Sequence, residues 1–117
     1  MLKSAVVEIH FMVYDKKLAE RIRKILKKYR GVGEKEMFGG LAFMLKGNMF
    51  CGIIKNDLVV RVGKEMNDEA LAKPHARPMD FTGKPISGYV FVSQSGLKTE
   101  KSLENWIKMG IDFVGKM

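Results

Sequence analysis

Segment 74–85 brings together four side chains that could do chemistry: His75, Arg77, Asp80 and Lys84. It also holds all three prolines of the chain, which fix their own φ and favour extended backbone at the preceding residue. The segment is therefore predicted to be an ordered loop that neither a helix nor a central strand can cross. In such a loop Arg77 can offer a planar fork to an anion, with His75 as a titratable donor and Asp80 as an orienting acceptor.

These residues also have a purely structural interpretation. Asp80 can pair with Arg77 or with Arg61, and its carboxylate can accept main-chain N–H groups of the loop. Such contacts would hold a loop that prolines alone cannot fix. We favour this structural interpretation. The alternative, which stays open, is a ligand or interaction site made of Arg61, His75, Arg77, Asp80 and Lys84.

No catalytic constellation accompanies the loop. Cys51 and His75 form the only thiol–imidazole combination, but Cys51 lies in an apolar stretch, where cysteine behaves as a small buried hydrophobe. One cysteine and two histidines exclude an internal disulfide and a Cys/His zinc site. The glycine-containing segments 31–33 and 83–84 lack the other residues of dinucleotide and phosphate loops. We therefore favour a protein without enzymatic activity, and expect no metal and no cofactor.

The net charge of +8 is concentrated in one segment. Between Asp15 and Arg30 the chain has eight cations against two carboxylates, whereas the remaining residues are nearly balanced. The cationic side chains are Lys16, Lys17, Arg21, Arg23, Lys24, Lys27, Lys28 and Arg30. Such a face is most often solvated surface. The alternative is weak, sequence-independent binding to the phosphates of a nucleic acid.

The positions of apolar residues predict the elements that must carry these side chains. Helical spacing predicts a helix over 15–29, with Asp15 as its N-cap. A change to a period of two then predicts short strands joined by tight turns at Gly-Gly, Gly-Asn and Asn-Asp pairs, which favours an antiparallel meander. The expected strands are 34–38, 41–46, 49–55 and 58–62.

Beyond the meander, a short helix is predicted over 64–73, and it ends before Pro74. Alternation predicts a fifth strand over 88–93, and Thr99 can cap a final helix in which Gly110 is expected to permit close packing. The sequence therefore predicts an α+β fold with about three helices and a five-stranded antiparallel sheet. The expected order is α-β-β-β-β-α-loop-β-α.

Several of the expected strands are apolar on both faces. In 49–55 and 58–62, apolar residues occupy successive positions, which a sheet with one wet face would not show. Three helices are too few to cover both faces of five strands. We therefore expect a homodimer that buries part of the sheet or a helix face. Methionines within the strands, such as Met37 and Met49, are expected to fill the core.

Length and composition set the class of protein. A chain of 117 residues with 46% hydrophobic residues is enough for one domain with its own core. No apolar run approaches the ~18 residues that span a bilayer, and residues 1–13 lack the pattern of a signal peptide. Together with the single cysteine, these observations favour a cytoplasmic protein without a membrane partner.

Three stretches of the sequence stand out as long motifs. They are MFGGLAFMLKGNMFCG (37–52), LVVRVG (58–63) and LAKPHARPMDFTGKP (71–85). In this order and spacing they resemble the TfoX N-terminal domain family. The resemblance extends from about Met12 to the C-terminus, and it implies a single α/β domain over 12–117 with an antiparallel sheet. Residues 1–11 are then interpreted as an extension or a misassigned start.

The family supplies no established catalytic residues, so the resemblance identifies only positions of interest. Those that shape the backbone of its motifs are Met37, Phe38, Gly39, Gly40 and Gly83. The family is named for TfoX and Sxy proteins, which regulate bacterial natural competence in transcription with a cyclic-AMP receptor protein. In those proteins a second, helical domain follows, which has no counterpart in this sequence. The resemblance implies a regulatory module with a protein partner in transcription.

Three hypotheses for function follow. The leading one is a non-enzymatic regulatory or interaction module, linked to the transcriptional control of competence. The second is a non-specific nucleic-acid-binding protein that uses the basic helix 15–30. The third is a small-ligand-binding or enzymatic domain with loop 74–85 as its site. A convergent polar pocket beside the loop would favour the third, and an apolar self-complementary patch would favour the first.

Overall fold

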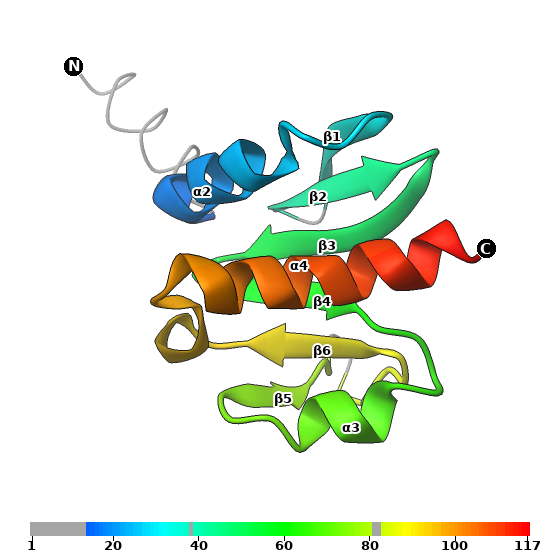
Figure 1. The fold of residues 1–117 in the computed structure, drawn as a ribbon. Coiled ribbons are helices and arrows are strands. Elements are labelled where there is room, and N and C mark those ends of the chain that lie inside the picture. Colours follow the sequence, from blue (N-terminus) through cyan, green and yellow to red (C-terminus); the bar gives the residue numbers. More distant parts are fainter. Residues whose placement is uncertain (1–13, 38, 81–82) are drawn as a thin grey trace.

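Six antiparallel strands form one sheet in the computed structural model of the chain, in the order β1-β2-β3-β4-β6-β5 (Figure 1). The structure describes residues 14–37, 39–80 and 83–117. The strands are β1 (Val32–Met37), β2 (Gly40–Leu45), β3 (Asn48–Ile54), β4 (Asp57–Arg61), β5 (Ala76–Pro78) and β6 (Tyr89–Val92). The helices are α2 (Lys16–Leu26), α3 (Asn67–Leu71) and α4 (Glu100–Gly115), with a short 3₁₀ helix, η1 (Gln94–Leu97), before α4.

The predicted α+β class and antiparallel meander are confirmed, with one additional strand. β5 lies within the proline-rich segment, pairs only with β6 and ends at Pro78. Proline has no N–H to donate, and it is tolerated there because β5 has a free outer edge. No central strand crosses the segment, as predicted, but the expected count of five strands is one too low.

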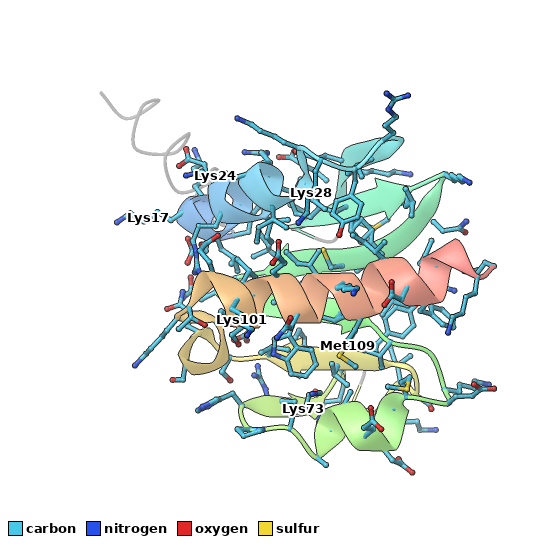
Figure 2. All side chains as sticks on the ribbon, in the orientation of Figure 1. Lys17, Lys24, Lys28, Lys73, Lys101 and Met109 are labelled. Carbon is cyan, nitrogen blue, oxygen red and sulfur yellow. The ribbon has the colours of Figure 1, made fainter. Side chains whose placement is uncertain are left out.

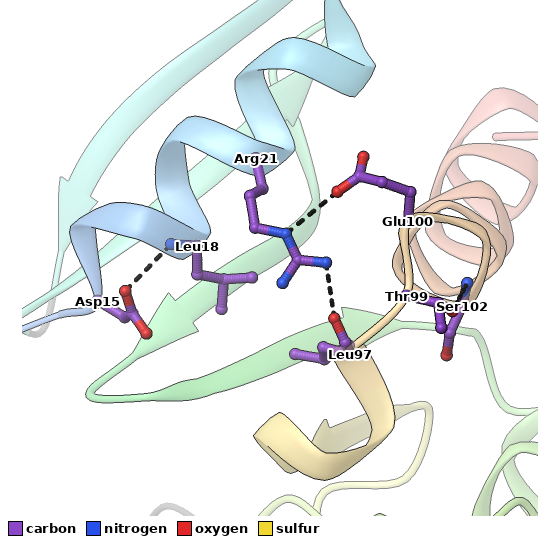
Figure 3. Close-up of polar contacts among 7 residues, drawn as sticks. All are labelled: Asp15, Leu18, Arg21, Leu97, Thr99, Glu100 and Ser102. Carbon is purple, nitrogen blue, oxygen red and sulfur yellow. Dashed lines mark hydrogen bonds and ion pairs between the residues drawn. The ribbon is translucent and has the colours of Figure 1, made fainter.

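Side chains at both helix starts explain where α2 and α4 begin. The Asp15 carboxylate accepts a hydrogen bond of 3.1 Å from the main-chain N–H of Leu18 (Figure 3). The Thr99 hydroxyl accepts one, also of 3.1 Å, from the N–H of Ser102. Both are the N-caps that the sequence predicts. The predicted helix extends to residue 29, whereas α2 ends at Leu26.

The helices α2 and α4 cover one face of the sheet (Figure 1). α4 runs along β3 and β4, and α2 lies beside it, towards β1 and β2. The core fills the space between these helices and the sheet. Its fully buried side chains include Ile22 from α2, Phe43 and Leu58 from the sheet, and Leu103 and Ile107 from α4.

The opposite face of the sheet, termed the far face, carries neither α2 nor α4. It is nevertheless apolar at its centre, where Ala42 is 2% exposed and Val59 is fully buried. Met79 and Ile86, from the connection between β5 and β6, line the same groove as Val59 and so help to cover it. The chain's own β5–β6 connection therefore performs part of the covering that was expected of a helix or a second subunit.

No helix within 14–37, 39–80 and 83–117 is both long and apolar enough to cross a membrane. The predictions about an N-terminal extension over 1–11 and a start near Met12 fall outside the described residues.

Candidate functional site

The candidate residues of the proline-rich segment do not converge on one site. His75 lies on the α4 side of the sheet, where it lines a cavity of about 410 Å³. Arg77 lies on β5, and side chains of β4 and of the residue after β6 hold its guanidinium. Asp80 and Lys84 are exposed and line none of the three cavities described below. The structure does not gather these four side chains around a common ligand.

Arg77 has three partners within the chain. Its guanidinium donates to Asp57 Oδ2 at 2.6 Å and to Ser93 Oγ at 3.0 Å, and its Cζ lies 4.8 Å from the centre of the Phe91 ring. The register explains these contacts, because Arg77 stands opposite Phe91 on β6, and Asp57 begins β4 on the other side of β6. The predicted pairing of Arg77 with Asp80 is therefore wrong, since Asp57 takes that place.

The cavity beside His75 is polar and cationic. His75 has a φ of +70°, a left-handed conformation that bulky residues rarely adopt. It packs so closely on Gly96 that a Cβ at position 96 would lie 2.9 Å from the His75 Cβ. The polar and aromatic side chains that line the cavity are Lys73, His75, Ser95, Lys98, Thr99, Ser102, Asn105 and Trp106. Of the four loop candidates, only His75 contributes to it.

A larger cavity, of about 630 Å³, contains Arg61. The Arg61 Cζ lies 5.7 Å from the centre of the Tyr89 ring and 5.3 Å from that of Phe113. Tyr89 is the register partner of Arg61 on β6, and Phe113 comes from α4. Arg61 forms no ion pair with a described carboxylate, so the predicted pairing with Asp80 is not observed. Met109 of α4 borders both this cavity and the one beside His75 (Figure 2).

A third cavity is an apolar groove of about 300 Å³ on the far face, and no motif of the sequence predicts it. Met37 and Met49, expected in the core, are only partly buried and line this groove instead. No charged side chain borders it in the described part of the chain. Its lining includes the large side chains of Met37, Leu41, Met49, Ile53, Ile54, Met79, Ile86 and Tyr89. The sequence signal for the groove is the two-sided apolar pattern of 49–55 and 58–62.

The motif glycines have backbone roles rather than chemical ones. Gly39 and Gly83 have φ values of +74° and +83°, in the left-handed region that favours glycine. Gly40 lies against β3 so closely that a Cβ there would overlap the carbonyl oxygen of Ile53. Phe38 falls outside the described residues. The motif around the β1–β2 turn thus specifies a backbone path.

The basic helix is tied to the fold by one of its own cations. Arg21 donates hydrogen bonds to the Glu100 carboxylate at 3.2 Å and to the Leu97 carbonyl at 2.7 Å (Figure 3). These contacts connect α2 to the residues at the start of α4. The role of Arg21 is therefore structural, although the sequence places it among the nucleic-acid candidates.

Two further cations of the helix are also paired. Arg23 donates two hydrogen bonds of 2.7 Å to Glu34 on β1, which lower the pKa of the Glu34 carboxyl. Lys28 donates one of 2.8 Å to Glu104 on α4, which raises the pKa of Lys28 and lowers that of Glu104. Three of the eight candidate phosphate-binding side chains thus already contact carboxylates of the same chain.

The other cations of the segment lie mostly at the surface. Lys17, Lys24, Lys27 and Arg30 are exposed and form no ion pair with described residues. Figure 2 shows Lys17 and Lys24 along α2, with Lys101 of α4 on the same side of the molecule. These side chains could contact phosphates, but Tyr29, the aromatic residue beside Arg30, is partly buried against the core.

The cysteine of the chain does not lie in a reactive setting. Cys51 is fully buried in β3, and burial raises the pKa of its thiol far above the ordinary range. A thiolate is the reactive form, so Cys51 is inert in the folded protein. Within the described residues, no group of three His, Cys, Asp or Glu side chains could hold a metal ion.

Comparison with known protein families gives one match, to the TfoX N-terminal domain, over residues 24–114. The match includes the sheet, the proline-rich segment and nearly all of α4, and it begins within α2. A search of curated proteins finds no match. Because the matched residues span most of its 117 residues, the chain belongs to the TfoX N-terminal domain family.

Proposed function

We propose that this protein is a non-enzymatic regulatory module of the cytoplasm, and that a second copy of the chain docks on its far face. The single observation that carries the proposal is the apolar groove of about 300 Å³ on that face. No acid, base or nucleophile other than the Tyr89 hydroxyl borders it in the described part of the chain, so its lining suits binding rather than chemistry. Family membership supports a regulatory role, because TfoX and Sxy proteins control competence in transcription.

A second copy is the occupant that fits the groove, because an exposed apolar side chain of the same chain lies at the groove and could enter the groove of a second copy. The large apolar side chains exposed in the described residues are Met66, Ile86 and Met117. Only Ile86 borders the groove. A two-fold axis near Ile86 would insert this side chain of each copy into the groove of the other, which is the isologous contact that a homodimer needs.

The groove forms only the centre of such an interface. A stable dimer buries roughly 1,200–2,000 Å² in total, so the surrounding far face must also take part. Arg77 lies on that face but is already held by Asp57 and Ser93, so it can join the rim without an uncompensated charge. The apolar centre and polar rim correspond to the usual anatomy of protein interfaces.

Nucleic-acid binding receives less support. Arg21, Arg23 and Lys28, three of the eight cations on which that hypothesis relies, form ion pairs within the chain. Breaking these pairs to bind phosphate would cost part of the binding energy. Weak attraction through the remaining surface lysines is compatible with the proposal and does not require a nucleic-acid function.

Sedimentation equilibrium of two matched variants tests the proposal. Ile86 and Met66 are each 38% exposed, but Met66 lies outside the groove. The wild-type protein should sediment as a dimer at micromolar concentration. Ile86→Asp should be monomeric, because a carboxylate cannot enter an apolar groove without a partner. Met66→Asp should dimerise like the wild type.

Circular dichroism of both variants checks that the fold is retained. A wild-type protein that stays at 13 kDa across this concentration range would overturn the proposed dimer. A dimer that survives Ile86→Asp would show that the second copy docks elsewhere.

A further inference from the structure

We propose that the cavity around Arg61 is a binding site for a small organic monoanion, a carboxylate that carries an apolar group. The site lies between β4, β6 and the C-terminal half of α4, and it shares only Tyr89 with the dimerisation groove, which no charged side chain of the described residues borders. In the bound state the carboxylate pairs with the Arg61 guanidinium, and the apolar group packs on the surrounding side chains.

The unused hydrogen-bonding capacity of Arg61 is the first argument. A guanidinium has five N–H donors and pairs best with a planar, two-oxygen acceptor such as a carboxylate. Arg61 is partly buried, and its guanidinium lies near two aromatic rings, whose faces cannot replace the in-plane hydrogen bonds of a carboxylate. It forms no hydrogen bond or ion pair with the described side chains.

Arg77 provides the comparison within the same sheet. Both arginines stack on aromatic rings, and both stand opposite β6 residues in the sheet register. Arg77, however, is bound by Asp57 and Ser93 at 2.6 and 3.0 Å. In this protein an arginine can therefore stack on an aromatic ring and bind a carboxylate at the same time. Arg61 stacks in the same way, but no carboxylate of the described residues binds it.

The geometry around Arg61 is fixed before any ligand binds. The Arg61 guanidinium lies near the Tyr89 ring of β6 and the Phe113 ring of α4, so side chains from two regular elements support it. Gly63, with a φ of +84°, makes room for this arrangement, because a Cβ there would overlap the Phe113 ring. A guanidinium that is already held in place loses little side-chain entropy when it binds a ligand.

The charges and the walls of the cavity define the ligand class. Besides Arg61, the charged lining residues are two cations and two anions, Lys64, Lys116, Glu65 and Asp112. The side-chain charges of these four balance, so Arg61 leaves one net positive side-chain charge, which matches a monoanion better than a dianion. The apolar part of the wall is formed by Val62, Met66, Tyr89, Met109, Phe113 and Met117. A cavity of about 630 Å³ is in the range of small-molecule sites.

Titration with three small probes, followed by amide NMR shifts, tests the site. Hexanoate carries both the carboxylate and the apolar group, hexanamide lacks the charge, and acetate lacks the apolar group. Hexanoate should shift the amides of residues around Arg61 in a saturable way. Hexanamide and acetate should each bind at least about tenfold more weakly, since each loses one of the two contributions.

Four variants identify the residue responsible. Arg61→Met keeps an apolar side chain beside the two rings but removes the guanidinium, and it should weaken hexanoate binding at least about tenfold. Arg77→Met removes the other stacked arginine and should leave the affinity unchanged. Met66→Glu adds a carboxylate at an exposed wall position and should weaken binding more than Met66→Gln, which removes the same apolar side chain without adding a charge. The Met66 pair keeps the test decisive if Arg61→Met fails to fold.

Three results would overturn the proposal. The first is the absence of saturable hexanoate shifts in the wild-type protein. The second is equal binding of hexanoate and hexanamide. The third is an unchanged affinity in Arg61→Met or, if that variant does not fold, equal affinities of Met66→Glu and Met66→Gln.

Discussion

Gly110 of α4 lies directly against the main chain of Phe50 in β3. A Cβ atom at position 110 would overlap the Phe50 carbonyl oxygen and would lie 3.1 Å from the carbonyl carbon. The helix therefore rests on the sheet at a distance that only glycine permits. The expectation that Gly110 allows close packing is confirmed. This contact sets the distance between α4 and the sheet.

Gly110→Ala should lower the free energy of unfolding by about 1–3 kcal/mol, because α4 must move away from β3 to make room. Alanine is the better helix former by about 1 kcal/mol, so a packing cost has to exceed that gain. Urea unfolding measures the difference. Gly115→Ala is the matched control in the same helix, since nothing lies within 4 Å of a Cβ there. Equal stability of Gly110→Ala and wild type would contradict the close contact.

Cys51 predicts a dependence of stability on alkaline pH. Burial keeps its thiol protonated in the folded state, whereas the unfolded chain loses this proton with a pKa near 8.5. Above about pH 8.5 the folded state therefore holds one proton more than the unfolded state, and the free energy of unfolding should fall as pH rises. The slope attributable to this thiol approaches about 1.4 kcal/mol per pH unit.

Urea unfolding between about pH 7 and 10 measures this slope, with Cys51→Ala as the control that lacks the thiol. The difference in unfolding free energy between wild type and Cys51→Ala should shrink as pH rises. A thiol reagent should also react with the wild-type protein only as fast as it unfolds. Rapid labelling of the folded protein would show that the Cys51 thiol is accessible to the reagent without unfolding.

The helices α2 and α4 were predictable because their signals are local, whereas α3 (Asn67–Leu71) is shorter than the helix predicted over 64–73 and has no side-chain cap. Asp15 and Thr99 are good N-caps next to runs of apolar residues at helical spacing, so the start of each helix can be read from a few consecutive residues. β5 gives no such signal, since Pro78 is its last residue and only pairing with β6 makes it a strand. An edge strand of this kind depends on tertiary contacts that local rules do not contain.

The candidate site was predictable only as a set of residues. The sequence nominated both Arg61 and Arg77, but it could not tell which one has a carboxylate partner. Asp57 reaches Arg77 across β6, and Phe113 reaches Arg61 from α4, so both outcomes depend on segments far apart in the chain. Asp80 is only three residues from Arg77 in the sequence, but in the fold Asp57 is the carboxylate that reaches this guanidinium.

The Arg77–Asp57 pair replaces Asp80 as the contact expected to hold the proline-rich segment. Asp57→Ala should cost about 0.5–1 kcal/mol, because the two side chains are 47% and 28% exposed and water screens much of their attraction. Asp80→Ala should stay within about 0.5 kcal/mol of wild type, since Asp80 is exposed. Thermal unfolding of both variants, with Arg77→Met completing a double-mutant cycle for the pair, measures the contact. A larger loss in Asp80→Ala would restore the original assignment.

The basic helix should bind nucleic acid only weakly and without preference for sequence. Each phosphate that a cation neutralises on duplex DNA contributes about 0.9 to the slope of log affinity against log salt. Lys17, Lys24, Lys27 and Arg30 form no ion pair with described residues, so contact through these four limits the slope to about 4. Such binding should be largely lost at physiological salt.

Fluorescence anisotropy with two unrelated duplexes across a salt series measures this slope. The double variant Lys24→Gln/Lys27→Gln should weaken binding to both duplexes equally and lower the slope by about 2, because two phosphate contacts are removed. Sub-micromolar affinity for one duplex at physiological salt, absent for the other and abolished in the double variant, would instead make DNA recognition the primary function, because charge alone cannot distinguish two sequences.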